Sequence, residues 1–200
     1  MRVAALYDIH GNLPALEAVL ADLRQTGVDQ VVVGGDVVPG PMAREALARL
    51  RKLDIPVQFI YGNCEVAVLR QMAGVDPPGV PEAFRPILRW TAQQQVPDYQ
   101  AFLETWPKTV RIEIHGAGPV LFCHGTPRDE DEDFLGSRRN RVCYRPSKAP
   151  YDYTQAAERI RATAYPQAQE FAAHHVLEPP AEEQMLEVLT RASGNQRATA

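Results

Sequence analysis

The sequence predicts an α/β fold, in which helices cover a parallel sheet, and three observations support this prediction. Short apolar runs alternate with amphipathic segments three times within residues 2–72. Each apolar run ends in a short polar loop that contains glycine, which is typical of a strand that leads directly into a helix. The chain of 200 residues, 45% hydrophobic, is long enough to bury a core without disulfide bonds. Three such units in a row imply parallel strands joined by right-handed crossovers.

The first predicted strand covers residues 2–7 and ends at a polar turn, DIHGN. Asn12 is suited to cap the helix that follows, and Pro14 suits its first turn. Apolar residues then recur at helical spacing as far as Leu23, and Gly27 ends the helix. This stretch is therefore the first strand–loop–helix unit.

The second and third units have the same order. Residues 30–33 form the second predicted strand, followed by GGDVVPGP and an amphipathic helix over 42–53. Residues 57–60 form the third strand, followed by GNCE and a helix near 65–72. Both strands are short continuous apolar runs, as expected for strands buried in a parallel sheet.

The pattern changes in the middle of the chain. Helical stretches are expected near 82–95 and 98–105, after a proline-rich segment. Residues 108–114 alternate in polarity and predict a strand, and residues 119–123 form another apolar run after a glycine-containing turn. We expect these last two segments to pair as a hairpin.

We expect three regions along the chain. Residues 1–135 form the main domain, residues 136–150 an irregular junction, and residues 151–200 a helical segment that packs on the same domain. The junction is predicted because an acidic run is followed directly by clustered arginines, which suits no packed element. The C-terminal helices should break near Pro166 and at Pro179–Pro180, since proline ends or kinks a helix.

Composition excludes several classes of protein. The net charge of −4 and the lack of a basic face make nucleic acid an unlikely main partner. No apolar run is long enough to span a bilayer, and the first residues do not resemble a signal peptide. Cys64, Cys123 and Cys143 are an odd number without a spacing motif, which indicates free thiols in a reducing compartment. We therefore expect a cytoplasmic protein.

Five side chains with oxygen or nitrogen donors follow the predicted strands. Asp8 and His10 follow the first strand, Asp36 the second, Asn63 the third, and His124 the hairpin. In α/β proteins, functional sites lie at the carboxyl ends of the strands, so these donors should converge. Asp8 and His10 are two residues apart on an exit that we expect to be extended, so both point the same way. This mixture of donors suits Mn²⁺, Fe or Zn²⁺ rather than Ca²⁺ alone or a thiolate zinc site.

The motifs DIHGN, GGD, GNCE and CHGTP, in this order, resemble the metal-binding motifs of calcineurin-like metallophosphoesterases. That family shows D-x-H, G-D, G-N-H-[DE], a later His and G-H-x-H, and the first three spacings agree. The resemblance covers roughly residues 1–135. The tail from residue 150 resembles the C-terminal helices of a bacterial, YfcE-like subgroup. The resemblance implies a four-layer αββα sandwich, which we expect here in a reduced form.

The resemblance also implies roles for the five donors. Asp8 and His10 would bind one divalent cation, Asp36 would bridge two, and Asn63 and His124 would bind the second. The cofactors would be two divalent ions, Mn²⁺ or else Fe, Zn²⁺ or Ni²⁺, with a single or weakly bound ion as the alternative. A metal-activated hydroxide would then attack a small phosphorylated substrate, with Asp36, Asn63 and His124 as the catalytic residues.

Two departures from the family pattern stand out. Residue 64 is Cys where many relatives have His, and Cys64 as an additional soft ligand is one interpretation. No G-H-x-H occurs, so we infer an internal deletion between about residues 136 and 149. The missing ligands would weaken metal binding, because water takes their place. The alternative function is therefore a shortened, non-catalytic relative that binds metal weakly or serves as an interaction module. A homo-oligomer that covers the open sheet edge is a third hypothesis.

Simpler explanations exist for each candidate ligand. Asp8 and His10 would also suit a plain turn, and Asp36 would suit a helix cap. Asn63 would suit a left-handed turn after a glycine, and His124 a core position at a strand end. These explanations remain open at the level of sequence.

Two further histidines and two glycines also concern the predicted metal site. His174 and His175 are an adjacent pair of imidazoles and so a conceivable replacement for the missing pair, but on a helix adjacent residues point about 100° apart. The resemblance implies that Gly35 and Gly62 let the backbone approach the metals closely.

Overall fold

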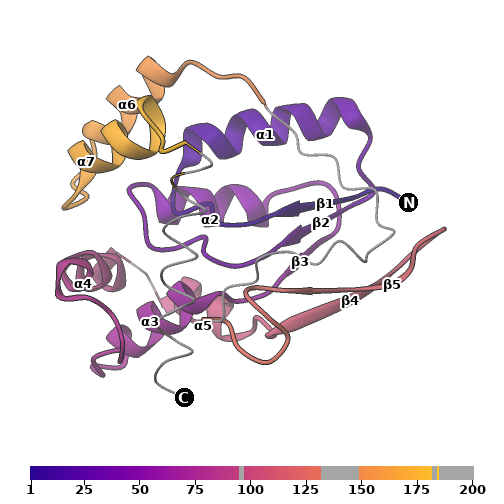
Figure 1. Cartoon of the computed structure of the whole chain (residues 1–200), viewed down its shortest axis with the longest axis horizontal. Coiled ribbons are helices and arrows are strands. Elements are labelled where there is room, and N and C mark those ends of the chain that lie inside the picture. Colours follow the sequence, from indigo (N-terminus) through magenta and orange to yellow (C-terminus); the bar gives the residue numbers. More distant parts are fainter. Residues whose placement is uncertain (95–96, 132–148, 182–183, 185–200) are drawn as a thin grey trace.

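The computed structural model of the chain describes residues 1–94, 97–131, 149–181 and 184. Within these residues, a parallel sheet covered by helices lies beside an antiparallel hairpin (Figure 1). None of the described helices is both long and apolar enough to cross a membrane. The predicted junction at 136–150, and with it the inferred deletion, lies almost entirely outside the described residues.

The parallel sheet consists of β1 (Val3–Leu6), β2 (Gln30–Val33) and β3 (Val57–Phe59), in the order β1-β2-β3. Its strands are the three predicted ones, with β1 and β3 slightly shorter than expected. β2 is central, and three of its four residues are fully buried valines, as its continuous apolar sequence predicts. Because all three strands run the same way, their carboxyl ends meet at one edge, where the polar loops begin.

The sheet alternates with α1 (Leu13–Thr26), α2 (Ala43–Arg51) and α3 (Asn63–Met72). Asn12 caps α1 as predicted, since its side-chain oxygen accepts a hydrogen bond from the backbone N–H of Ala15 at 3.3 Å. In Figure 1, α1 and α2 lie together on one side of the sheet and α3 lies near β3. Each loop is therefore held between a strand end and a helix start.

The middle of the chain contains η1 (Glu82–Phe84), α4 (Arg85–Gln94) and α5 (Pro97–Glu104). The hairpin follows, with β4 (Thr109–Ile114) paired antiparallel to β5 (Gly118–Cys123). The predicted hairpin is confirmed, and among the described residues it forms a sheet separate from β1–β3. The loop that carries His124 begins directly after β5.

Three helical elements lie in the described part of the C-terminal region. They are α6 (Tyr153–Arg161), α7 (Ala168–Ala172) and the π-helix η2 (Ala173–Leu177). The predicted break near Pro166 lies between α6 and α7. An ion pair of 2.8 Å between Arg159 and Glu17 joins α6 to α1, so the region packs against the first helix of the chain.

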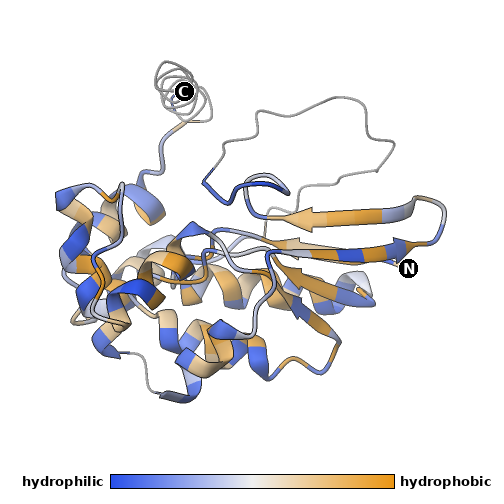
Figure 2. Ribbon diagram, turned by 90° about the horizontal axis from the view of Figure 1, so that it is seen from below, coloured by the Kyte–Doolittle hydropathy of each residue, from blue (hydrophilic) through white to orange (hydrophobic). Residues whose placement is uncertain are grey.

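The main core forms where the helices meet the parallel sheet, and apolar residues gather there (Figure 2). Leu47 of α2 is fully buried in this core, whereas Leu121 of β5 is 49% exposed. The same substitution at these two positions therefore separates core packing from surface effects.

Leu47→Ala is expected to lower the free energy of unfolding by about 2–5 kcal/mol, because it removes buried methyl groups and leaves a cavity. The control, Leu121→Ala, should change it by less than about 0.5 kcal/mol. Urea denaturation followed by circular dichroism measures both. Similar losses for the two variants would contradict the placement of α2 against the sheet.

Candidate metal centre

The loops after β1 and β2 turn sharply as they leave the sheet. Asp8, His10 and Asp36 have φ angles of 51°, 44° and 54°, so all three lie in the left-handed region that residues with a side chain rarely adopt. The prediction of an extended exit for Asp8 and His10 is therefore wrong. The loop coils tightly instead, because three hydrogen bonds from its N–H groups to carbonyls of the neighbouring loop hold it, with Asp8 bound to Gly35, His10 to Asp36 and Gly11 to Val37. Strained backbone of this kind is typical of functional sites.

The structure brings all five predicted donors together at the carboxyl edge of the sheet. Nε2 of His10 lies 3.8 Å from Oδ1 of Asp8 and 3.7 Å from Oδ2 of Asp36. Nε2 of His124 lies 3.6 Å from Oδ1 of Asp36 and 3.1 Å from Oδ1 of Asn63. Asp36 is thus central, with one carboxylate oxygen toward each histidine, and its side chain is only 6% exposed.

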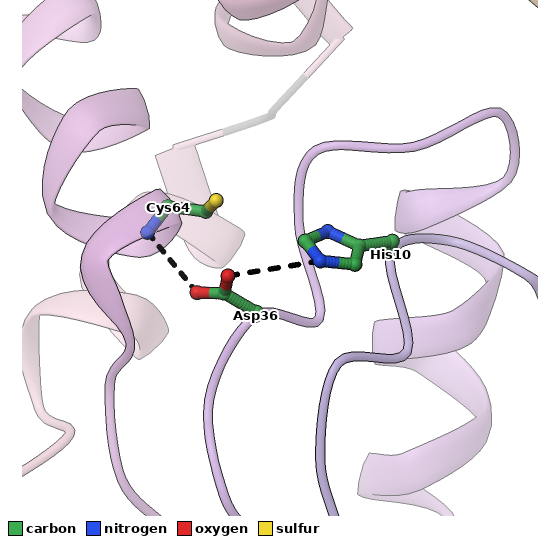
Figure 3. Close-up of side chains that lie close together, drawn as sticks. All are labelled: His10, Asp36 and Cys64. Carbon is green, nitrogen blue, oxygen red and sulfur yellow. Dashed lines mark hydrogen bonds and ion pairs between the residues drawn. The ribbon is translucent and has the colours of Figure 1, made fainter. Parts of the chain in front are cut away.

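Cys64 also lies in this cluster, although it was not among the five predicted ligands. Its backbone N–H donates a hydrogen bond to Oδ1 of Asp36 at 3.0 Å, and its side chain lies beside Asp36 and His10 (Figure 3). Burial, and then the charge of Asp36, raise the pKa of the Cys64 thiol. The signal in the sequence was the position of this cysteine directly after Asn63.

The donor atoms form two overlapping groups among the described residues. One consists of His10, Asp36 and Cys64, and the other of Asp8, Asp36 and His124. Within each group the three donor atoms lie within 4.8 Å of one another. Both groups include Asp36, so one carboxylate is common to the two sets of donors that could hold a cation. Carboxylate, imidazole and thiol donors together suit divalent transition metals.

The orientation of His124 also fits a cation. Its Nδ1 lies 2.9 Å from the carbonyl oxygen of Gly34, which can only accept a hydrogen bond, so we assign the proton to Nδ1. Nε2 then directs a lone pair toward Oδ1 of Asn63, another acceptor, at 3.1 Å. Two neighbouring ligands of an octahedral ion lie about 3 Å apart when each is about 2.1 Å from the metal. His124 and Asn63 are therefore spaced to share one cation.

Negative charge accumulates in the same place. Partial burial, followed by the charge of Asp36, raises the pKa of Asp8. Carboxylates held this close repel one another, and a bound cation relieves that repulsion. The donor set and its charge therefore both fit the divalent metals that the sequence motifs imply.

A buried glutamate, Glu65, holds the loop after β2 in place. Glu65 is fully buried, and its two carboxylate oxygens accept hydrogen bonds from the backbone N–H groups of Asp36, Val37, Val38 and Gly62 at 2.7, 2.8, 3.2 and 2.8 Å. Burial, and then the charge of Asp36, raise the pKa of Glu65 to about 7, although these N–H donors favour the charged form. Glu65 thus joins the loop after β2 to the start of α3. No role of Glu65 was predicted from the sequence.

Two glycines allow the close approach of these loops. A Cβ on Gly62 would overlap Oδ1 of Asp36, and one on Gly35 would lie 2.5 Å from the backbone nitrogen of Gly62 and 3.0 Å from Nδ1 of His124. Because Gly62 has an ordinary φ of −104°, it is required there for space rather than for backbone freedom. The two glycines thus permit close approach of the loops to one another, and the expected approach of the backbone to the metals stays a prediction.

Two of the simpler explanations for the candidate ligands are excluded. Asn63 is the first residue of α3 rather than a left-handed turn, and the residue at the N-cap position of α2 is Met42 rather than Asp36. His174 and His175 belong to neither donor group among the described residues.

Glu65→Gln is expected to lower the free energy of unfolding by about 2–4 kcal/mol above the pKa of Glu65. The amide nitrogen would meet two of the backbone N–H donors, which would then lack an acceptor. The matched control is Glu17→Gln, because the exposed Glu17–Arg159 pair should contribute less than about 1 kcal/mol. Urea denaturation measures the free energy of unfolding of both variants. Equal losses would show that the hydrogen bonds of Glu65 do not hold the loop after β2 to the start of α3.

Gly62→Ala is expected to weaken Mn²⁺ binding at least about tenfold, because the added methyl group displaces the Asp36 carboxylate. Isothermal titration calorimetry measures the affinity. The control, Gly79→Ala, strains the backbone because its φ is +75°, but its added methyl group meets no atom within 4 Å, so it separates a general loss of stability from displacement of Asp36. Unchanged affinity in a folded Gly62→Ala variant would be incompatible with a cation at Asp36.

Two solved structures resemble the chain. A metallophosphoesterase from Sphaerobacter thermophilus is 30% identical, with a TM-score of 0.50, and the match covers 68% of this chain and 51% of that protein. The hypothetical protein PH1004 from Pyrococcus horikoshii is 24% identical, with a TM-score of 0.54, over 68% of this chain and 60% of that protein. These likenesses confirm the predicted fold class.

A curated relative is also similar in sequence. The uncharacterized protein MJ0912 of Methanocaldococcus jannaschii is 29% identical over 128 residues, which are 63% of this chain and 50% of that protein. The chain therefore spans about half the length of this relative.

The family model for calcineurin-like phosphoesterases matches residues 1–187, which is more of the chain than the predicted residues 1–135. The assignment to a YfcE-like subgroup stays a prediction. Because the match covers nearly the whole chain, and its motifs lie at the strand ends where the donors converge, the chain belongs to the calcineurin-like phosphoesterase family.

Proposed function

We propose that the chain hydrolyses phosphate esters with two divalent cations held by Asp8, His10, Asp36, Asn63 and His124. The observation that supports this most directly is the position of Asp36, whose carboxylate belongs to both groups of donors. A carboxylate common to two cation positions suits a two-metal site for displacement at phosphorus. Family membership supports the same class of reaction.

When bound, the two cations would polarise the phosphoryl group and activate the attacking water. The protein's own residues position the reactants. The hydrogen bond of 2.9 Å to Gly34 keeps the His124 imidazole oriented with Nε2 toward the site. Asn63 begins α3, so the positive end of this helix lies at the donor cluster and would attract an anionic phosphate there. The backbone N–H of Asp36 donates a hydrogen bond to Glu65, and this contact limits the movement of Asp36 during the reaction.

Finer features of the function are also proposals. We propose Mn²⁺ as the working metal, because carboxylate, amide and imidazole donors suit it. We propose a small phosphorylated substrate, in keeping with the net charge of −4, which does not favour nucleic acid. A cytoplasmic location agrees with the free thiols of Cys64 and Cys123. Homo-oligomer formation stays a prediction.

The second candidate function is a non-catalytic relative that binds metal. The absence of G-H-x-H from the sequence favours it, since that motif supplies two ligands in the family pattern. Turnover and metal binding therefore have to be measured separately.

The wild-type protein is expected to hydrolyse bis-p-nitrophenyl phosphate or p-nitrophenyl phosphate in the presence of Mn²⁺ but not of a chelator. Asp36→Asn and His124→Asn should each lose about a hundredfold or more in kcat/KM, because each removes a ligand from the site. The control is His115→Asn, since His115 lies in the exposed turn between β4 and β5.

Release of p-nitrophenol followed by absorbance measures these rates, and calorimetry measures Mn²⁺ binding in the same samples. A folded wild-type protein that binds Mn²⁺ but turns over no faster than Asp36→Asn would support the non-catalytic relative instead.

A further inference from the structure

We propose that Cys64 is a metal ligand, and that Cys64, His10 and Asp36 together form a subsite for a thiophilic divalent cation such as Zn²⁺, Co²⁺ or Cd²⁺. The inference rests on the proposed metal centre but changes its chemistry, since one of the two positions then contains sulfur. The neighbouring group of Asp8, Asp36 and His124 has only oxygen and nitrogen donors. The two positions would therefore select different metals.

The positions of the three donor atoms support this proposal. The donor atoms of Cys64, His10 and Asp36 lie within 4.8 Å of one another, and Nε2 of His10 is 3.7 Å from Oδ2 of Asp36. Figure 3 shows Cys64 and His10 on either side of the Asp36 carboxylate, with Cys64 at the start of α3 and the other two side chains in the loops after β1 and β2. A sulfur, a nitrogen and an oxygen thus converge from separate directions, as ligands around one ion do.

The local structure holds Cys64 in this position. It is the second residue of α3, and its N–H is fixed by the 3.0 Å hydrogen bond to Oδ1 of Asp36. Glu65, the next residue, anchors the same turn through its four backbone hydrogen bonds. A buried cysteine that only fills space lies among apolar side chains, whereas Cys64 is half-buried and its neighbours include a carboxylate and an imidazole. Such surroundings suit a ligand.

Binding of a metal ion by Cys64 needs no reactant other than the cation. A divalent cation enters between the three side chains, the S–H bond of Cys64 breaks, a sulfur–metal bond forms, and the proton leaves to solvent. Thiolate binds Zn²⁺, Co²⁺ and Cd²⁺ strongly and Mn²⁺ weakly, so sulfur at this position favours the first three metals. Three protein ligands leave further positions of the ion open to water and substrate, as in catalytic zinc sites.

The test uses the full chain and metals as probes. Since the sequence has three cysteines, the double variant Cys123→Ser/Cys143→Ser keeps Cys64 as the sole thiol. On titration with Co²⁺, this variant is expected to show a sulfur-to-cobalt charge-transfer band in the near ultraviolet. Adding Cys64→Ser should abolish the band. Cys123→Ser alone, the matched control, should retain it.

Affinities give a second measure. Cys64→Ser should weaken Cd²⁺ binding at least about tenfold, while its Mn²⁺ affinity stays within about twofold, because only the thiophilic ion depends on sulfur. A cation centre without sulfur ligation would instead give equal Cd²⁺ affinities in wild type and Cys64→Ser, and that result would overturn the proposal.

A third measurement needs no change at Cys64 and so does not depend on how its variant folds. Cadmium-113 NMR of the double variant is expected to show the strong downfield shift of a sulfur-bound ion. A bound cadmium ion with only nitrogen and oxygen ligands would overturn the proposal. These readouts do not involve turnover, so a sulfur-bound metal in an inactive protein would leave this inference standing and remove the proposed hydrolase function.

Discussion

The carboxylate of Glu65 makes the interaction on which the rest of the site depends. Four backbone N–H groups from two loops donate to it in a fully buried position, so the loop after β2 and the start of α3 cannot separate without leaving several donors unpaired. One of these N–H groups belongs to Asp36 itself. The orientation of Asp36 therefore follows from Glu65, and the positions of the other ligands follow from Asp36.

The sequence predicted the elements of the fold well, because their signals are local. Val31–Val33 form a continuous apolar run, and the leucines of α1 recur at helical spacing. Placing donors at the strand ends was also sufficient to find all five candidate ligands. The extended exit of Asp8 and His10 was wrong, since their left-handed conformations depend on hydrogen bonds to the neighbouring loop, which no local pattern reveals.

Glu65 was missed, and Cys64 as a ligand was only one interpretation, for a similar reason. Glu65 follows Asn63 by two residues and reads as an ordinary acidic residue near a helix start, but its acceptor role requires the loop that carries Asp36, nearly thirty positions away. Cys64 stands where many relatives have His, and a soft metal ligand was one interpretation of this departure. Whether its sulfur meets His10 depends on how the start of α3 packs against the loops after β1 and β2, which is a property of the tertiary structure.

The contact between His124 and Gly34 has a consequence for folding. These residues are 90 positions apart, and His124 follows directly after β5, so its position at the site depends on how the hairpin docks against the sheet. A cation bound by both His124 and Asp36 would bridge the two sheets. By mass action, such an ion stabilises the docked arrangement in proportion to the logarithm of its concentration. The metal would thus serve as a structural tie between the halves of the molecule as well as a reagent.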